Sequence, residues 1–437
     1  MKHPITLGVV CMGRDSFDVG AATEIYGAKK PELRSIENVR WIMIDEIVKE
    51  VDEAEAAAQA FLREAVDGVV LLSGTFHLGH LALVFERRLD KPKLLWGFNE
   101  LPYNGGKIRL NTVCAVNLNA SNLYKSGSDS YVCHVGDAID EAWIDAVRIR
   151  AALGSARLGV LGARAHGFFN LGVDELAFFG KTGAMFDYYD LREGYEQAVS
   201  REELAESVAA AKKIFPCGDV NEAQIEKTAR LVCSLRKFVE KNRLDAVAVR
   251  CWPEFAAQYG VAPCAAMSIL QAEGHILACE GDIQGAVSML AFQAIGVKSP
   301  YLADLSQIDF ENNFALMWHC GVAPADLWDG VSERSLDTYF AGGKGVTAGF
   351  VMKSGPVHIL RVDSARGKTR MLAERGAAEP MEKLLRGTYA KVVFEKSARA
   401  LIDLVTTSGV AHHVALAYGD YTDVLQRLSR IMGWEIL

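Results

Sequence analysis

Two short stretches decide how this sequence folds: Asp245-Ala-Val-Ala-Val-Arg-Cys-Trp-Pro-Glu254 and His275-Ile-Leu-Ala-Cys-Glu-Gly-Asp282. Each is a run of mainly apolar residues that ends in acidic ones. Continuous apolar runs are typical of parallel strands that are covered on both faces. The stretch Pro263–Glu273 between them has a helical pattern, so the two runs are expected to be neighbouring strands of one parallel sheet. In open α/β sheets ligands bind beyond the carboxyl ends of the strands, which is where these acidic residues fall.

The same alternation of strand and helix extends through the first 300 residues. Strands are expected at Ile5–Met12, Val39–Ile44, Asp67–Gly74, Lys93–Trp96, Arg157–Gly162 and Phe186–Leu191. Helices are expected at Ser16–Lys29, Val51–Val66, Leu78–Arg87, Glu141–Leu153, Asn221–Lys241 and Asp282–Ile295. Asn221 and Gln224 have the spacing of a capping box at the start of one of them. This pattern predicts doubly wound α/β domains.

Beyond residue 300 the pattern changes to short strands without helices between them. They are expected at Phe314–Cys320, Val346–Met352, Val357–Val362, Thr369–Ala373, Ala390–Glu395 and His412–Ala417. Such a series predicts an antiparallel or barrel-like unit. We therefore predict an α/β protein with two doubly wound parallel-sheet domains, residues 1–154 and 155–298, and a smaller, mainly β, barrel-like domain, residues 299–437. The second domain carries the acidic motif.

The composition excludes several classes of protein. The net charge of −8 argues against nucleic acid as a partner, because such proteins carry a clustered basic face. No apolar run approaches the roughly 18 residues of a membrane-spanning helix. The nine cysteines are scattered without a CxxC pair, which favours the reducing cytoplasm and argues against a zinc ribbon.

The acidic strand ends suggest a metal site. Neighbouring strands would bring Glu254 close to Glu280 or Asp282, and gathered carboxylates need a cation or a shared proton. Hard divalent ions such as Mg²⁺ or Mn²⁺ prefer these oxygen ligands. A purely structural interpretation stays open: Glu280 or Asp282 caps the following helix, and Glu254 lies in an exposed loop.

The motif Cys279-Glu-Gly-Asp-Ile-Gln-Gly-Ala-Val-Ser-Met289 resembles the core motif of the L-fucose isomerase and L-arabinose isomerase superfamily. Trp252-Pro-Glu254-Phe255 lies at a matching distance before it. Gly409-Val-Ala-His412-His413 is similar to the segment that brings a histidine to the metal of that family. The resemblance covers the second and third domains in order, whereas the first matches only in its general α/β character.

The resemblance implies a manganese-dependent aldose–ketose isomerase, with Mg²⁺ or Co²⁺ as alternative ions. Glu254 would be a metal ligand or the base that transfers the proton. The second acid would be Glu280, as in arabinose isomerases, or Asp282, as in fucose isomerases; the sequence Ile-Gln-Gly-Ala that follows favours Asp282 as ligand and catalytic residue. His413 would be the metal imidazole, and only one of His412 and His413 should reach the metal, because adjacent strand residues face opposite ways.

Further residues are expected to contact the substrate rather than the metal. They are Glu280, His319, Trp252, Arg14 and His412. Asp309 stands where arabinose isomerases have an additional metal histidine, which favours a three-ligand site of the fucose type. The family also implies a homo-oligomer, a trimer or a hexamer, with sites near the subunit interfaces.

The expected reaction moves a proton between C1 and C2 of a monosaccharide through a cis-enediol. A metal ion would stabilise the negative charge and a carboxylate would move the proton. The expected sugar is fucose, arabinose or a hexose modified at C6, such as sulfoquinovose, whose sulfonate would need cations such as Arg14, Arg250 or Lys344. The alternatives are a non-catalytic sugar-binding protein and a metal-dependent epimerase or aldolase on the same site.

Overall fold

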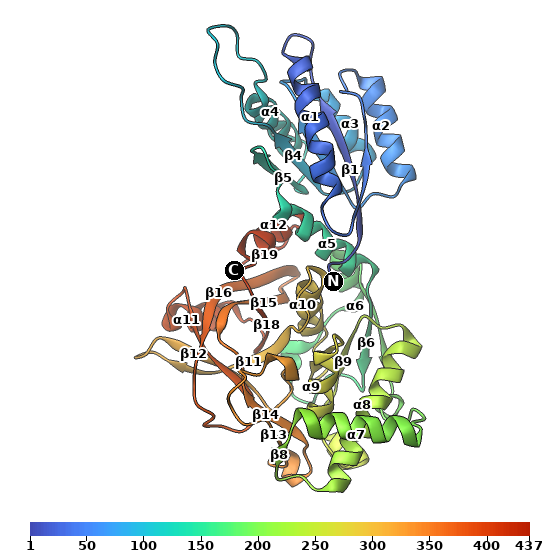
Figure 1. Ribbon diagram of the computed structural model, residues 1–437, viewed down its shortest axis with the longest axis vertical. Coiled ribbons are helices and arrows are strands. Elements are labelled where there is room, and N and C mark those ends of the chain that lie inside the picture. Colours follow the sequence, from blue (N-terminus) through green and yellow to red (C-terminus); the bar gives the residue numbers. More distant parts are fainter. The chain divides into compact units, whose positions relative to one another are not determined.

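The protein consists of two compact units, described here from a computed structural model of residues 1–437 (Figure 1). The N-terminal unit contains residues 2–151 and 423–434. The larger unit contains residue 1 and residues 152–422 and 435–437. No helix in either unit combines the length and apolar character required to span a bilayer.

The N-terminal unit is built on a five-stranded parallel sheet with the order β2-β1-β3-β4-β5. Its strands are β1 (Ile5–Met12), β2 (Val39–Met43), β3 (Gly68–Ser73), β4 (Lys93–Gly97) and β5 (Tyr131–Val135). Its helices are α1 (Val19–Arg34), α2 (Val51–Arg63), α3 (His80–Arg88), α4 (Thr112–Lys125), α5 (Glu141–Ser155) and α12 (Thr422–Met432). A Cβ on Gly8 of β1 would lie 2.8 Å from the ring of Phe61 in α2. Glycine at this position therefore allows the helix to pack closely on the sheet.

The larger unit begins with a four-stranded parallel sheet with the order β10-β9-β6-β7. Its strands are β6 (Arg157–Leu161), β7 (Met185–Tyr189), β9 (Ala246–Val249) and β10 (Ile276–Cys279). Its helices are α6 (Glu175–Thr182), α7 (Arg201–Ile214), α8 (Glu222–Asn242), α9 (Cys264–Ala272) and α10 (Ile283–Ala294). The expected capping box of α8 is confirmed, because Asn221 and Gln224 each accept the other's backbone N–H.

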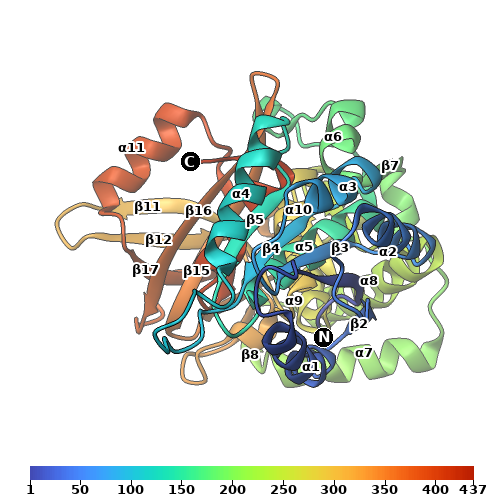
Figure 2. The same ribbon diagram turned by 90° about the horizontal axis from the view of Figure 1, so that it is seen from above.

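A ten-stranded, mainly antiparallel sheet follows in the larger unit. Its strands are β8 (Cys217–Gly218), β11 (Tyr301–Asp309), β12 (Phe314–His319), β13 (Ser335–Asp337), β14 (Thr347–Val351), β15 (Gly355–Ala365), β16 (Lys368–Glu379), β17 (Thr388–Phe394), β18 (His413–Tyr418) and β19 (Glu435–Ile436), with helix α11 (Ala398–Ser408) before β18. An additional pairing of β16 with β17 closes the path β16-β15-β18-β11-β12-β17 into a ring. Figure 2 shows this curvature, with β11 and β12 extending as a hairpin.

The predicted fold class is confirmed: two parallel sheets with helices are followed by a mainly β C-terminal sheet. The stretches Asp245–Glu254 and His275–Asp282 contain β9 and β10, which pair in parallel as expected. The sequence analysis did not predict β11, because this strand begins just after the expected domain boundary at residue 298 and alternates apolar and polar residues only in part. One buried core joins the parallel sheet and the ring, from Leu161 to Leu416.

Candidate active site

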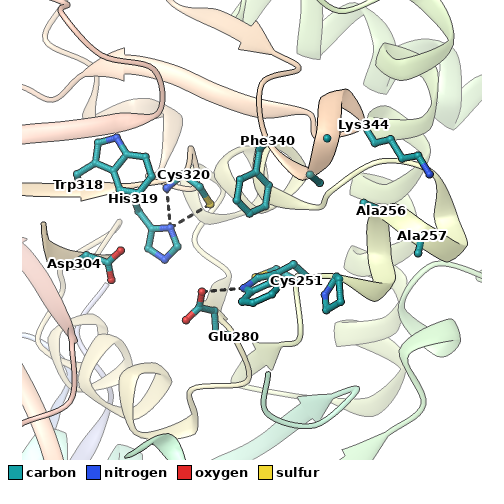
Figure 3. A pocket seen from close by; sticks show the side chains of 14 residues that line it. Cys251, Ala256, Ala257, Glu280, Asp304, Trp318, His319, Cys320, Phe340 and Lys344 are labelled. Atoms are coloured by element: carbon teal, nitrogen blue, oxygen red, sulfur yellow. Dashed lines mark hydrogen bonds between the residues drawn. The ribbon is translucent and has the colours of Figure 1, made fainter. Parts of the chain in front are cut away.

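A cavity of about 640 Å³ opens at the carboxyl ends of β9 and β10 (Figure 3). Three of its lining residues, Glu280, Asp304 and His319, carry carboxylates or an imidazole. Trp252, Trp318 and Phe340 supply aromatic walls. A concave, largely apolar cavity with a few converging polar groups is the usual form of a small-molecule site. All of these residues belong to the larger unit.

Glu280 reaches the cavity through an unusual backbone turn. It follows β10 directly and has a left-handed conformation, with φ of 63°. Non-glycine residues rarely adopt this region, and such strain is concentrated at functional sites. The indole Nε1 of Trp252 donates a hydrogen bond of 3.0 Å to Glu280 Oε1. The second oxygen, Oε2, is thereby held in a fixed position.

Gly281 makes this turn possible, because a Cβ at this position would lie 2.5 Å from the carbonyl oxygen of Ala163. We expect Gly281→Ala to destabilise the protein by about 2–4 kcal/mol, from backbone strain and overlap together. The measurement is the free energy of unfolding in urea. Gly409→Ala is the matched control. The φ of Gly409, 63°, is close to the 74° of Gly281, but a Cβ on Gly409 would have no atom within 4 Å. If Gly281→Ala lowers the free energy of unfolding no more than Gly409→Ala does, the close contact with the Ala163 carbonyl oxygen is contradicted.

Two histidines face the free oxygen of Glu280. Nε2 of His412 lies 3.3 Å from Glu280 Oε2, and Nε2 of His413 lies 3.4 Å from it. This differs from the expectation that only one of the two would point this way. The reason is that β18 begins at His413, so His412 precedes the pleated strand and is not bound by its alternation. The ring of Phe168 stacks on His412 at 5.1 Å and fixes its orientation.

Asp304 enters the site from β11. It is paired directly with His413 in the antiparallel register of β11 and β18, and such partners project on the same face. Its Oδ1 lies 3.5 Å from Nε2 of His413 and is buried without a hydrogen-bond partner. Burial raises the pKa of Asp304 above its ordinary value. A buried carboxylate oxygen without a partner is uncommon and indicates a missing cation or proton.

Asp282 lies behind the site and is completely buried. Its Oδ2 accepts a hydrogen bond of 2.9 Å from Nδ1 of His413 and forms an ion pair with Arg361, which is also fully buried. Burial acts to raise the pKa of Asp282, but the charge of Arg361 and the hydrogen bond from His413 lower it well below its ordinary value. Asp282 also caps α10 through Oδ1 and the backbone N–H of Gly285.

The partners of the imidazoles decide which nitrogen of each ring is free. Because Asp282 accepts from Nδ1–H of His413, Nε2 is the nitrogen of that ring that faces Glu280 and Asp304. The reverse holds for His319, whose Nδ1 accepts the backbone N–H of Cys320 at 2.8 Å. Burial lowers the pKa of His319 to about 4, so the ring is neutral and its buried, unpartnered Nε2 carries the proton. His413 is therefore a potential metal ligand and His319 a hydrogen-bond donor.

These residues fit a divalent metal ion. Two overlapping groups of residues could supply ligand atoms: Glu280-His412-His413 and Asp304-His319-His413. Within each group the possible ligand atoms all lie within 4.8 Å of one another. In octahedral coordination at about 2.1 Å, neighbouring ligand atoms are roughly 3 Å apart, which is near the separations of His413 Nε2 from the two carboxylates. The oxygen of Asp304 that lacks a hydrogen-bond partner and the approach of two carboxylates to His413 favour a cation.

Glu254 lies apart from these groups. Its Oε2 accepts a hydrogen bond of 2.7 Å from Nε of Arg250, and the two side chains line a separate cavity of about 560 Å³ beside β6 and β7. The structure therefore does not bring Glu254 together with Glu280 in one crevice. Arg14 lies in the N-terminal unit, where it is exposed. Asp309 is the half-buried last residue of β11 and accepts backbone hydrogen bonds from Glu311 and Asn312.

Asp304 is the residue that the sequence analysis missed. The signal was present in Tyr301-Leu-Ala-Asp-Leu305, where one carboxylate interrupts an apolar run. Nothing in this stretch identifies the partner strand, because β18 lies more than a hundred residues further along the chain. The pairing of Asp304 with His413 is a tertiary feature, and only a correct strand order would have predicted it.

Comparison with known proteins gives one consistent relationship. The chain is 29% identical over 441 residues to proteins named sulfoquinovose isomerase from Priestia aryabhattai and Priestia megaterium, covering 98% of both chains in each pair. A protein of the same name from Alkalicoccus urumqiensis is 27% identical over 391 residues, which cover 86% of this chain and 88% of that protein. No family model matches the chain.

Solved structures add nothing to this relationship. An ABC transporter solute-binding protein from Burkholderia multivorans and a carbohydrate transporter from Acidothermus cellulolyticus match 67% and 68% of this chain, and 95% and 91% of their own chains, at 12% identity. Their TM-scores of 0.20 and 0.19 are too low to support a conclusion about fold or function. The sequence relationship that stands is therefore the one to sulfoquinovose isomerases, and it extends over nearly the full length of the chain.

Proposed function

We propose that this protein is a divalent-metal-dependent aldose–ketose isomerase, with Mn²⁺ as the ion and sulfoquinovose as the substrate. One observation carries the proposal: Glu280 and Asp304, which both line the cavity, approach Nε2 of His413 at 3.4 and 3.5 Å, and a buried oxygen of Asp304 has no hydrogen-bond partner. The names of the full-length relatives support both the reaction and the sugar. The motif around Glu280 supports a place in the L-fucose and L-arabinose isomerase superfamily, with a homo-oligomer as the expected state.

The proposed ligands are Glu280, Asp304 and His413. This set keeps the two carboxylates and one histidine of the sequence prediction but replaces Glu254 and Asp282. Asp282 instead holds His413 in the orientation in which Nε2 faces Glu280 and Asp304. His412, whose Nε2 lies 3.3 Å from Glu280, orients that carboxylate. Three protein ligands leave positions open for sugar oxygens or water.

The residues that line the cavity then have definite roles in the reaction. A bound divalent ion supplies Lewis-acid stabilisation of the negative charge on neighbouring sugar oxygens. Asp304 lines the cavity beside that centre and moves the proton between C1 and C2 through the cis-enediol. His319 donates its Nε2–H to a sugar oxygen, and burial keeps this ring neutral at physiological pH. The walls formed by Trp252, Trp318 and Phe340 exclude water from the reacting carbons.

Metal removal tests the proposal directly. After treatment with a chelator, we expect the protein to lose its conversion of sulfoquinovose to the ketose and to regain it with Mn²⁺. The conversion is followed by NMR, with L-fucose and both arabinoses as comparison sugars. Full activity of the metal-free protein would contradict the metal dependence. Metal-dependent binding of the sugar without any conversion would favour the non-catalytic sugar-binding protein, and formation of a C2 epimer would favour an epimerase.

A further inference from the structure

We propose that Lys344 binds the anionic group at the C6 end of the substrate and so selects a negatively charged sugar. This inference rests on the proposed function, because it takes the cluster of Glu280, Asp304 and His413 as the end of the cavity that receives C1 and C2. The three cations considered from the sequence were Arg14, Arg250 and Lys344. The structure places these three cations in different surroundings.

The cavity has two chemically different ends. Figure 3 shows Asp304 and His319 on one side, Glu280 below them, and Lys344 on the opposite side beside Ala256 and Ala257. Among the lining residues, Lys344 is the sole lysine or arginine. A sugar whose C1 and C2 lie at the acidic end would extend its other end along the aromatic walls toward this ammonium group.

The ammonium group of Lys344 is also available for a ligand. It forms neither an ion pair nor a hydrogen bond in the structure, and its side chain belongs to an exposed residue. Arg250, in contrast, is committed to Glu254 and faces the separate cavity beside β6 and β7. Arg14 belongs to the N-terminal unit and lines neither cavity. Lys344 is thus the cation that the larger unit offers to a ligand in this cavity.

The backbone gives Lys344 a defined place at the rim. Gly345 donates its N–H to the carbonyl oxygen of Phe340 at 2.9 Å and forms a parallel bridge with Ala262, so the loop is closed just after the lysine. Gly342 and Gly343 have φ values of 67° and 84°, which turn the chain sharply before it. Phe340, at the start of the loop, packs its ring against the cavity. The loop therefore presents an aromatic wall and a cation together.

A sulfonate suits this arrangement because it remains anionic at all physiological pH values and accepts hydrogen bonds from an ammonium group. Charge-assisted hydrogen bonds of this kind contribute about 1.5–3 kcal/mol, which corresponds to a factor of roughly 10 to 150 in affinity. A neutral sugar of the same size would gain nothing from Lys344. The residue is therefore expected to determine specificity without taking part in the proton transfer.

The experiment compares sulfoquinovose with its uncharged 6-deoxy counterpart, quinovose, in the manganese-loaded protein. We expect Lys344→Met to raise KM for sulfoquinovose by about tenfold or more, with kcat and the kinetics on quinovose nearly unchanged. Lys344→Arg should retain most of the preference for the charged sugar. Lys213→Met, on the exposed surface of α7, is the control for removing one positive charge. Equal losses on both sugars, or no loss on sulfoquinovose, would overturn the proposal.

Calorimetry separates this inference from the proposed reaction. If the wild-type protein converts no sugar, the isomerase assignment fails, but binding of the two sugars still decides the role of Lys344. Tighter binding of sulfoquinovose than of quinovose, lost in Lys344→Met and kept in Lys213→Met, would support the lysine as the anion-binding residue. Equal binding of the two sugars by the wild-type protein would refute it.

Discussion

Replacing Asp304 by asparagine is expected to abolish most of the isomerase activity while leaving the fold intact. The side chain keeps its shape but loses the charge that holds the cation and the oxygen that moves the proton. Positioned acid–base groups contribute about 10²–10⁴-fold, so kcat/KM should fall by at least this factor. Stability should hardly change, because burial already raises the pKa of this carboxyl and its Oδ1 has no hydrogen-bond partner. The measurements are steady-state kinetics, Mn²⁺ titration and urea unfolding.

Glu254→Gln distinguishes the two possible ligand sets. If Asp304 is the ligand, Glu254→Gln retains its affinity for Mn²⁺, since this carboxylate is paired with Arg250 in the separate cavity. If the set expected from the sequence is correct, Glu254→Gln loses the metal and Asp304→Asn keeps it. The two variants therefore give opposite results under the two assignments, and each serves as the control for the other.

Asp282→Asn is expected to be the most destabilising single change at the site. It removes the closer of the two carboxylates beside the fully buried guanidinium of Arg361, whose Nε lies 3.9 Å from Asp363 Oδ1, and breaking a buried ion pair in this way costs about 3–5 kcal/mol. The pKa of Asp282 lies below its ordinary value in the folded protein, so the ion pair stabilises the fold above about pH 4 and this contribution is lost as the pH falls further. The difference between wild type and variant should therefore shrink in acid.

A double variant separates stability from the orientation of His413. Asp282→Asn combined with Arg361→Met removes both buried charges and should recover much of the lost stability. It should not recover Mn²⁺ affinity, which we expect to be 10–100-fold weaker because Nδ1 of His413 no longer meets a carboxylate. Recovery of both properties in the double variant would contradict the role assigned to Asp282.

The sequence was informative about local structure and about residues close together in the chain. The apolar runs of β9 and β10 predicted two paired parallel strands, and the motif after β10 placed Glu280 and Asp282 at their carboxyl ends. The backbone at this motif explains why the two acids have different environments. Glu280, in its left-handed turn, points to the cavity, whereas Asp282 turns inward to cap α10. The spacing of Glu280 and Asp282 in the sequence did not decide which of the two faces the cavity.

The part of the site that could not be predicted depends on contacts between distant segments. Asp304 meets His413 only because β11 and β18 are neighbours in the ring, and β11 itself was not expected. The direction of Glu254 depends on Arg250, four residues earlier, which holds it toward β6 and β7 rather than toward β10. Sequence patterns report burial and period, but they carry little information about which strand lies beside which.

The closed ring of strands has a consequence for how such a protein can diversify. Because β16 pairs with β17, every strand of the ring has at least two neighbours, and a shift of β11 against β18 would break pairings all the way round. Residues 340–345, in contrast, form a short loop that is closed by the hydrogen bond from Gly345 N–H to the carbonyl oxygen of Phe340. Exchanging this loop between related chains should therefore change which sugar is accepted while the reacting centre stays as it is. The ring of strands thus constrains the residues of the reacting centre, whereas the residues that determine substrate preference lie in a loop that can change independently.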